Sequence, residues 1–130
     1  MNEKMDPQQC IRVLADHEQI NSCRQKLGQM DEAVDNLARQ LALAGNSTRF
    51  KILFLLHNEQ KLCVCDLADI LQLKTPAVSH HLRKLRDAGT IKGEKKGQTI
   101  FYMLTPESAT LLAPFFEQLA PRTISKSSES

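Results

Sequence analysis

The sequence predicts a mainly α-helical domain with one small β-hairpin. Apolar residues recur at helical spacing in most segments between residues 30 and 119, which is the pattern of helices with one buried face. In the stretch IKGEKKGQTIFYML (91–104) they alternate instead around a Gly-Gln turn, which is typical of a hairpin. Two short helices joined by a tight turn directly precede this hairpin. The order of these elements predicts a winged helix-turn-helix, which we expect to be homodimeric.

Three helices are predicted in the first part of the chain. An amphipathic pattern over residues 7–27 predicts a helix that begins at Pro7. Residues 30–44 carry a clearer apolar stripe, and Gly45 is a natural helix end. Asn46 then offers a cap for the helix that contains FKILFLLHN. Because this helix is apolar on most sides, we expect it to lie at the centre of the core.

A helix-turn-helix is predicted next. A short helix over residues 64–72 is followed by a tight connection, QLK. Thr75-Pro76 then predicts a helix start, because threonine caps a helix and proline in the first turn loses no needed N–H group. Apolar residues at helical spacing continue to Gly89, which ends the second helix. This second helix, residues 76–88, occupies the position of a recognition helix.

The hairpin and a last helix complete the predicted fold. Apolar residues alternate along the second strand, and Lys96-Gly97-Gln98 supplies the turn. Thr105-Pro106 repeats the combination of a cap and a proline, so a helix is expected over residues 106–119. Leucine and phenylalanine residues form an apolar stripe along this helix.

Composition limits the class of protein. The chain has 130 residues, which suits one domain with one core. No apolar run reaches the roughly 18 residues of a membrane span, and MNEKMDPQQC lacks the apolar part of a signal peptide. We therefore expect a cytoplasmic location, where four cysteines indicate metal binding or redox chemistry rather than disulfides. The sequence shows no nucleophile with its base and no Gly-rich phosphate loop, so an enzyme is not expected.

Basic residues are concentrated in residues 74–96, which contain seven Lys and Arg against two acidic residues in a chain of net charge +2. Such a patch is typical of a DNA-binding surface, although a solvated charged face has the same composition. We assign base edges or adjacent phosphates to Ser79, His80 and Arg83. The residues assigned to phosphates are Lys84, Arg86, Lys95 and Lys96. His81 lies between the exposed and buried sectors of the helix, and we expect it to pack.

The motif KLCVCDL places two of the four cysteines, Cys63 and Cys65, two positions apart. On a regular helix such residues face about 200° apart, so both reach one ion only if Cys63 precedes the helix and Cys65 lies in its first turn. The sequence places them there, at a helix N-terminus, which favours the thiolate form. Two thiolates are half of a tetrahedral soft-metal site, and Cys10 and Cys23 are candidates for the other half. Two other roles stay open for Cys63 and Cys65: they are small apolar residues that only pack, or they are thiols of a redox switch.

We expect three parts in the chain. Residues 1–29 form an N-terminal segment that is partly helical and carries metal ligands. Residues 30–120 form the winged helix-turn-helix domain for DNA binding and dimerisation, and residues 121–130 form a polar, disordered tail. The helices over residues 30–44 and 106–119 have apolar faces that the core does not need. We therefore expect them to pair across a two-fold axis.

Four stretches of the sequence together resemble the ArsR/SmtB family of metal-sensing winged-helix repressors. They are LALAGNSTRFKILFLL, LCVCDLADIL, AVSHHLRKLRDAGTI and GQTIFYML, and they span residues from about 37 to 105. LCVCDL is among the more specific short motifs of the family. The resemblance implies a homodimer that represses its own operon and leaves operator DNA when metal binds.

Within the family, LCVCDL with N-terminal cysteines resembles the cadmium- and lead-sensing branch. The implied ligands are Cys63 and Cys65, with Cys10 and Cys23 from the other protomer. The implied effector is a soft divalent metal ion (Cd, Pb or Zn). Cys10 and Cys23 lie farther apart than the N-terminal pair of that branch, so a three-coordinate site that suits lead, bismuth or arsenite is also open. The alternative function is an arsenite- or thiol-redox-responsive repressor of the same fold.

Overall fold

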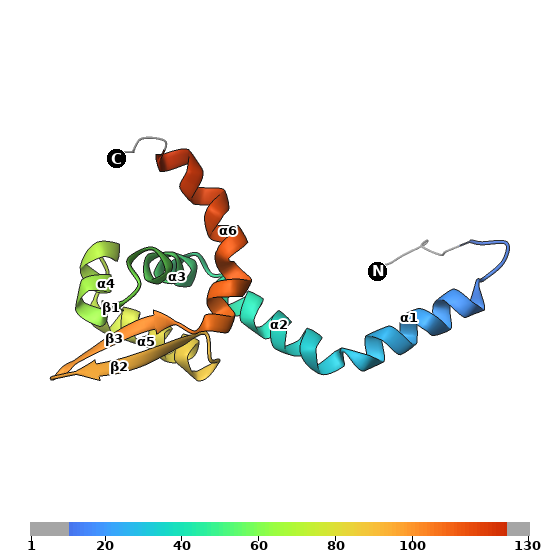
Figure 1. Cartoon of the computed structure of the whole chain (residues 1–130), viewed down its shortest axis with the longest axis horizontal. Coiled ribbons are helices and arrows are strands. Elements are labelled where there is room, and N and C mark those ends of the chain that lie inside the picture. Colours follow the sequence, from blue (N-terminus) through green and yellow to red (C-terminus); the bar gives the residue numbers. More distant parts are fainter. Residues whose placement is uncertain (1–10, 125–130) are drawn as a thin grey trace. The chain divides into compact units, whose positions relative to one another are not determined.

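The computed structural model describes residues 11–124 of the chain, and their side chains as far as residue 119 (Figure 1). The chain divides into two compact units, Met1–Leu37 and Ala38–Ser130. This boundary lies within helix α2 (Asp31–Ala44), whereas the sequence predicts a domain boundary between residues 29 and 30.

The described part of the first unit contains helix α1 (His17–Gln29) and the first half of α2. The backbone of Asp16 is extended, and its carboxylate accepts a hydrogen bond of 3.0 Å from an N–H group of the first turn. The predicted start at Pro7 is wrong, because residues 11–16 are not helical. A side-chain cap satisfies a free N–H group at the helix end, whereas proline only restricts φ. Residues 7–10 lie outside the described residues.

The second unit contains the end of α2 and four further helices. Their bounds are α3 Ser47–Glu59, α4 Val64–Leu71, α5 Thr75–Asp87 and α6 Pro106–Ile124. The predicted cap Asn46 is confirmed, since its side chain accepts a 3.0 Å hydrogen bond from the N–H group of Arg49. Residues 121–124 of the predicted tail belong to α6, and residues 125–130 lie outside the described residues. Within the described chain, no helix combines the length and the apolar character that a membrane crossing requires.

Helices α4 and α5 form the predicted helix-turn-helix. Gln72 ends α4 in a left-handed conformation, with a φ of 59°. The carbonyl of Lys74 accepts a hydrogen bond of 3.3 Å from the N–H group of Val78, so Lys74 is the cap of α5. The prediction that Thr75 caps this helix is wrong: Thr75 is its first residue and makes no capping bond. Pro76 lies in the first turn, as predicted.

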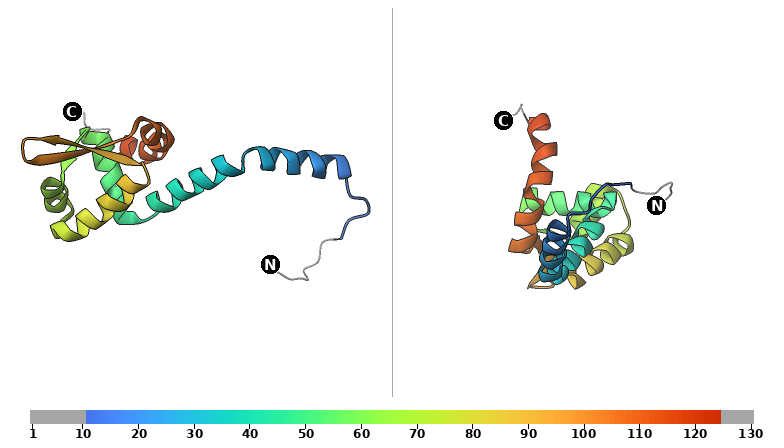
Figure 2. Two further views of the ribbon diagram at one scale, coloured as in Figure 1. Left: turned by 90° about the horizontal axis from the view of Figure 1, so that it is seen from below. Right: turned by 90° about the vertical axis from the view of Figure 1, so that its right-hand side faces the viewer.

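Strands β2 (Ile91–Lys96) and β3 (Thr99–Leu104) form the predicted hairpin. The hairpin projects from the helices of the second unit as a wing (Figure 2). Lys96 pairs with Thr99 across a two-residue turn. In this turn Gly97 has a φ of +65°, a conformation that favours glycine.

The sheet contains a third strand, β1 (Leu62–Cys63), on the other side of β3. Leu62 pairs with Tyr102 and Cys63 pairs with Phe101, both antiparallel. The sequence does not predict this strand, because two residues are too few to show alternation. As a result, the first cysteine of KLCVCDL belongs to the same sheet as the wing.

Helix α3 lies at the centre of the core, as predicted. Three of its side chains are at most 1% exposed: Ile52, Leu53 and Leu56. The ring of Phe116 on α6 lies 5.3 Å from that of Phe50 and 5.8 Å from that of Phe54, measured between centroids. Tilted and edge contacts between aromatic rings add to the stabilisation from apolar burial. These contacts fix the inner face of α6 against α3.

Replacement of Leu53 by alanine tests the central position of α3. Leu53 is 0% exposed, and deletion of a buried leucine side chain costs about 3–5 kcal/mol of the free energy of unfolding. We expect a loss in this range for Leu53→Ala in urea unfolding at fixed protein concentration. Leu73→Ala, at a leucine that is 40% exposed, is the matched control and should lose less than half as much. Equal losses in the two variants would contradict the assignment of α3 to the core.

Candidate functional site

The outer face of α5 carries residues predicted to contact DNA. Three inner side chains, each at most 2% exposed, fix the orientation of the helix: Val78, Leu82 and Leu85. Ser79 is half-buried at the edge of the outer face. The exposed positions are His80, Arg83, Lys84 and Arg86. The helical period therefore predicts the exposed sector correctly, while the contacts of these residues with DNA stay a prediction.

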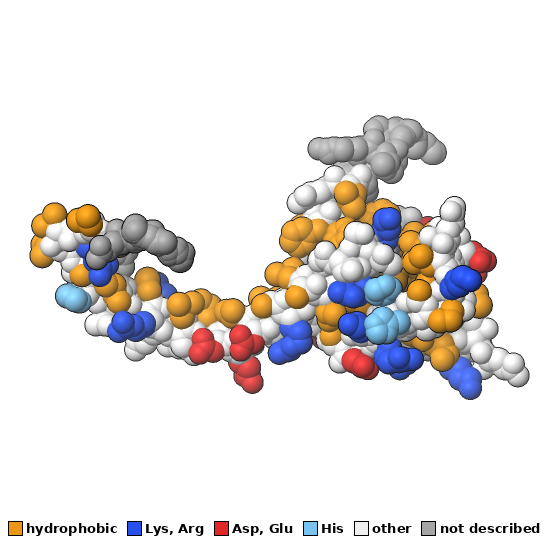
Figure 3. Space-filling model, turned by 180° about the vertical axis from the view of Figure 1, so that it is seen from behind, with side chains coloured by type: hydrophobic (Ala, Val, Ile, Leu, Met, Phe, Trp, Pro, Cys, Tyr) orange, Lys and Arg blue, Asp and Glu red, His pale blue; other side chains and the backbone are white. Residues whose placement is uncertain are grey.

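The wing adds basic side chains near its tip. Lys95 and Lys96 are exposed at the end of β2, and Lys92 is exposed near its start. Glu94 lies between them, so the wing is not uniformly basic. Figure 3 shows lysine and arginine side chains gathered beside histidines on one face of the second unit. Helix α5 and strand β2 are in contact, so their cations lie near one another and can face the same stretch of a phosphate backbone.

His81 is half-buried beside these residues, in agreement with its predicted packing role. Its Nδ1 lies 3.5 Å from Nη1 of Arg49, and its ring centroid lies 5.9 Å from that of His80. Burial lowers the pKa of His81 below its usual 6.5, and the charges of Arg49, His80 and Lys84 lower it further. The imidazole is therefore neutral at about pH 7 and can accept a hydrogen bond from the guanidinium of Arg49.

Arg49 joins the end of α2 to α3 and α5. Its Nε group donates a hydrogen bond of 2.7 Å to the carbonyl of Leu43, while its Nη1 faces His81. A cationic side chain is favourable at the last carbonyl groups of a helix. No sequence signal predicts this residue, because its partners lie 6 and 32 positions away.

Cys63 and Cys65 lie at the start of α4, in the arrangement that convergence on one ion requires. Cys63 is extended (φ −92°, ψ 169°) and occupies the cap position, with no side-chain capping bond. Cys65 follows in the first turn of the helix. Both are free thiols, with Cys63 half-buried and Cys65 exposed. The predicted backbone arrangement is confirmed, whereas the role of the two thiols as ligands stays a prediction.

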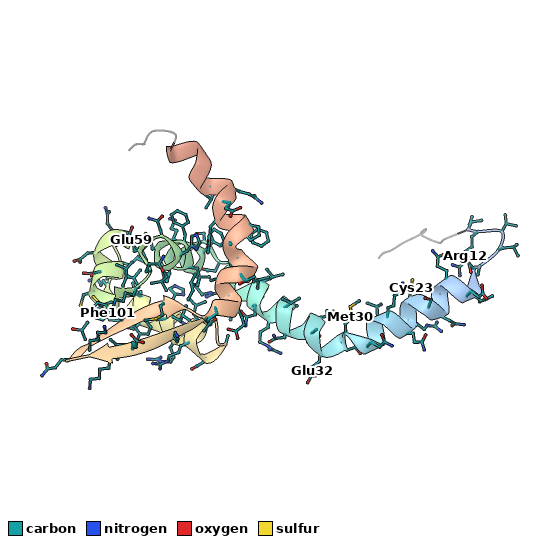
Figure 4. The ribbon with its side chains drawn as sticks, viewed as in Figure 1. Arg12, Cys23, Met30, Glu32, Glu59 and Phe101 are labelled. Carbon is teal, nitrogen blue, oxygen red and sulfur yellow. The ribbon has the colours of Figure 1, made fainter. Side chains whose placement is uncertain are left out.

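The two thiols line a groove of 420 Å³ between the start of α4 and the wing. The wing side of the groove is formed by Gln98, Thr99, Ile100 and Tyr102. Phe101, the sheet partner of Cys63, lies on the same strand (Figure 4). An ion bound by the thiols would therefore lie against the wing.

The described residues of the second unit supply two soft donors, Cys63 and Cys65, and not a complete metal site. Within the part of the chain that the structure describes, no group of three or more His, Cys, Asp or Glu side chains could hold a metal ion. Thiolates suit soft ions, and a stable site for such ions has three or four ligands. Cys23 is exposed on α1 in the first unit (Figure 4), and Cys10 lies outside the described residues. The chemistry of Cys63 and Cys65 fits a soft metal whose remaining ligands come from elsewhere.

An apolar groove of 510 Å³ runs between the end of α2 and α6. Large apolar side chains line it and stay exposed: Leu41 by 44%, Phe115 by 43% and Leu119 by 49%. A smaller groove of 230 Å³ continues from it along α3, and both are lined by Phe50 and Lys51. Contiguous apolar surfaces of this kind mark contacts with other proteins.

Residues 46–92, from the cap of α3 to the start of β2, match the bacterial regulatory proteins of the arsR family. The chain is 31% identical over 103 residues to the cadmium resistance transcriptional regulatory protein CadC homolog of Staphylococcus aureus, a match that covers 79% of this chain and 84% of that protein. It is 42% identical over 62 residues to the arsenic resistance transcriptional regulator ArsR1 of Pseudomonas putida, over 48% of each chain.

The fold is similar to that of the transcriptional regulator HlyU from Vibrio vulnificus CMCP6. The two structures have a TM-score of 0.63 and 33% sequence identity, and the match covers 73% of this chain and 98% of that one. All three similar proteins carry the name of a transcriptional regulator, and none carries that of an enzyme.

The lowered pKa of His81 predicts a pH dependence of stability. The folded chain binds this proton more weakly than the unfolded chain, whose pKa is 6.5, so protonation favours the unfolded state. The stability that the neutral His81 contributes is complete above this value and is lost as pH falls through the folded pKa. NMR titration should give His81 a midpoint below 6.5, and Arg49→Gln should raise that midpoint in part, since burial remains. A midpoint at or above 6.5 in the wild-type protein would contradict this prediction.

Proposed function

The chain belongs to the arsR family of bacterial regulatory proteins, and we propose that it represses transcription by binding operator DNA as a homodimer. In this proposal, a soft metal ion bound by cysteine thiolates releases the DNA. As a family member, the chain is a regulatory protein and not an enzyme. The observation that carries the proposal is the position of the thiol pair, at the start of the helix-turn-helix and against the wing.

Double-stranded operator DNA is the proposed partner of α5 and the wing. In a helix-turn-helix the second helix enters the major groove, where its early residues reach base edges. We propose this role for Ser79, His80 and Arg83. The residues proposed to contact phosphates are Lys84, Arg86, Lys95 and Lys96. DNA and reduced thiols are both found in the cytoplasm, which is the proposed location.

A second copy of the chain is the proposed occupant of the apolar groove between α2 and α6. Leaving Leu41, Phe115 and Leu119 partly in water is unfavourable for a monomer. A two-fold axis through this surface is self-complementary, because each copy offers the same two helices to the other. Such a dimer would place two α5 helices in successive major grooves, about 34 Å apart.

Cys63 and Cys65 are the proposed metal ligands of the second unit, and Cys10 and Cys23 of the other protomer are the proposed partners. Cadmium, lead or zinc is the proposed effector, because thiolates select soft ions. The name of the Staphylococcus aureus relative refers to cadmium resistance. Arsenite is the alternative effector, since ArsR1 is named for arsenic resistance and a site with one N-terminal cysteine would have three thiolates. A redox switch that uses the same cysteines is a further alternative.

Release of DNA follows, in this proposal, from two connections of the thiol pair. Helix α4 is the first helix of the helix-turn-helix and packs against α5. Cys63 also pairs with Phe101 in the sheet that carries the wing. An ion that joins the N-terminal segment to these thiols would therefore act on the recognition helix and the wing together. A coupling free energy of about 1–3 kcal/mol is typical, and DNA then weakens metal binding by the same factor.

Single Cys→Ser variants at the four cysteines test the metal site. Without oxygen, the wild-type protein should show sulfur-to-metal ultraviolet absorption with cadmium or lead and should release a fluorescent duplex of its own promoter. Cys63→Ser and Cys65→Ser should lose this metal-induced release and keep DNA binding without metal, because neither thiol lies on the outer face of α5. Cys10→Ser and Cys23→Ser then separate a four-thiolate site from a three-thiolate site.

The same assay separates the alternatives for the effector. Release by arsenite with no response to cadmium, lead or zinc would favour the arsenite-responsive repressor. Release by an oxidant, with metals inactive, would favour the redox switch. Full metal-induced release in the double variant Cys63→Ser/Cys65→Ser would contradict the proposed site.

The double variant Lys95→Ala/Lys96→Ala tests the wing. Each lost phosphate contact removes about one released counterion, and a dimer of the variant lacks two lysines in each protomer. The slope of log K against log salt should therefore fall by about 2–4 for every duplex. Fluorescence anisotropy over a series of salt concentrations measures this slope. Arg24→Ala/Lys26→Ala, which removes the same charge from exposed positions of α1, is the control and should leave the slope unchanged. An unchanged slope in the wing variant would count against a wing that contacts DNA.

A further inference from the structure

The buried polar side chains of the described residues are Thr90, 1% exposed, and Ser108, 2% exposed. Both belong to one hydrogen-bond network, which we call the polar node. Its residues are Gln40, Thr90, Thr105 and Ser108. Buried polar groups need hydrogen-bond partners, so a network of this kind specifies one arrangement of the elements that carry it.

Gln40 connects α2 to the end of α5. Its Nε2 donates a hydrogen bond of 3.2 Å to the carbonyl of Ala88, the C-cap of α5. Its Oε1 accepts a hydrogen bond of 3.3 Å from the hydroxyl of Thr90. The nitrogen and the oxygen of the amide each make one hydrogen bond. The two bonds therefore fix the orientation of the Gln40 side chain as well as its distance from the end of α5. Because Thr90 directly precedes β2, Gln40 holds the junction between the recognition helix and the wing.

Thr105 connects the same junction to α6. Its N–H group donates a hydrogen bond of 3.1 Å to the carbonyl of Thr90. Its hydroxyl lies 2.9 Å from the carbonyl of Gly89 and 2.9 Å from the hydroxyl of Ser108. Gly89, with a φ of +79°, makes the turn that presents these carbonyl groups. The start of α6 is therefore fixed to the point where α5 ends and β2 begins.

The polar node lies where two kinds of element meet. Helices α2 and α6 line the apolar groove proposed to bind a second copy, and α5 and β2 carry the residues proposed to contact DNA. Ala44 is the one buried residue of α2, and apolar contacts have no preferred direction. Apolar packing alone therefore does not fix the orientation of α2 relative to the end of α5, whereas the hydrogen bonds of Gln40 do.

We propose that Gln40 and Thr90 are positioning residues for DNA binding: they set the angle between the dimerisation helices and the DNA-reading surface. This angle determines which spacing of half-sites the dimer accepts. The inference rests on the proposed function, because it presupposes a dimer on a two-fold DNA site. One base pair of spacing shifts a half-site by about 3.4 Å and turns it by about 35°, so a small change of the angle changes which spacing fits.

A network that only stabilised the fold would have a different effect. Its loss would weaken binding to all duplexes by the same factor, because the shape of each folded dimer would be unchanged. Loss of the positioning role instead leaves folded dimers that accept several spacings. The readout is therefore the ratio of affinities for native and altered spacing, and not the affinity itself.

The test compares Gln40→Met and Thr90→Val, which keep the approximate side-chain volume. The first removes both side-chain bonds of Gln40, and the second removes the hydroxyl bond of Thr90 to Gln40. The probes are duplexes with the inverted repeat that the wild-type protein selects from a random DNA pool, at native spacing and with one or two base pairs added or removed. We expect the wild-type protein to prefer native spacing by about tenfold or more, and each variant to reduce this ratio to about threefold or less. The double variant should match the single variants, because both residues act in one network.

Thr110→Val is the matched control, because its hydroxyl bonds to the carbonyl of Pro106 within α6 and outside the polar node. It should keep the wild-type ratio. Circular dichroism and light scattering establish which variants are folded dimers. Gln40→Asn, whose amide is too short to reach both partners, replaces Gln40→Met if that variant is not folded.

Two results would overturn the inference alone while the wild-type protein binds DNA. The first is a full wild-type ratio in folded Gln40 and Thr90 variants, even with weaker binding overall. The second is an equal loss of the ratio in Thr110→Val. If the wild-type protein selects no duplex at all, the proposed function fails, and the inference fails with it.

Discussion

The pairing of β1 with β3 is the interaction on which the candidate metal site depends. It holds Leu62 and Cys63 in an extended conformation, so α4 begins at the following residue. Cys63 consequently precedes the helix, and Cys65 lies in its first turn. If both residues were within the helix, their side chains would point to opposite faces of it. The ammonium group of Lys61 lies 5.4 Å from the centre of the Phe101 ring, a cation–π contact that holds the chain just before the strand. The thiols and the wing are therefore parts of one junction.

The wing is fixed at its base by the polar node, and strand β1 and the thiol groove contact it farther along. At the base, Thr90 is hydrogen-bonded both to Thr105 and to Gln40. Farther along, β1 pairs with residues 101–102 of β3, and the groove beside the thiols reaches the turn at Gln98. If a hairpin is fixed at its base and an ion binds beside it nearer the tip, the largest displacement is at the tip, where the basic side chains lie. In the proposed thiol switch, metal binding would therefore act on the position of the wing as well as on the recognition helix.

How far apart two interacting residues lie in the sequence decides whether the sequence predicts their interaction. The cap at Asn46 and the exposed sector of α5 depend on residues within one helical turn, so residue type and period are sufficient. The start of α1 is a local feature too, but the sequence offers two candidate starts, at Pro7 and after Asp16. The helix begins after Asp16, which caps it. The strand β1 and the polar node join residues far apart in the chain: the partners of Gln40 are 48 and 50 positions away. A glutamine on an amphipathic helix is usually solvated, so nothing in its sequence context indicates a partner.

The second unit supplies two thiolates, and this number constrains how the proposed switch works. A soft ion held by two thiolates has open positions for further ligands, and the proposal supplies them from the N-terminal segment. The binding free energy then includes the cost of bringing that segment to the start of α4. Four thiolates within the second unit would bind the ion in every arrangement of the N-terminal segment, and binding would then favour none of them. In the proposed site the ligands would be divided between two parts of the chain, so metal binding would select one arrangement, and DNA would respond only to the extent that its own affinity differs between arrangements.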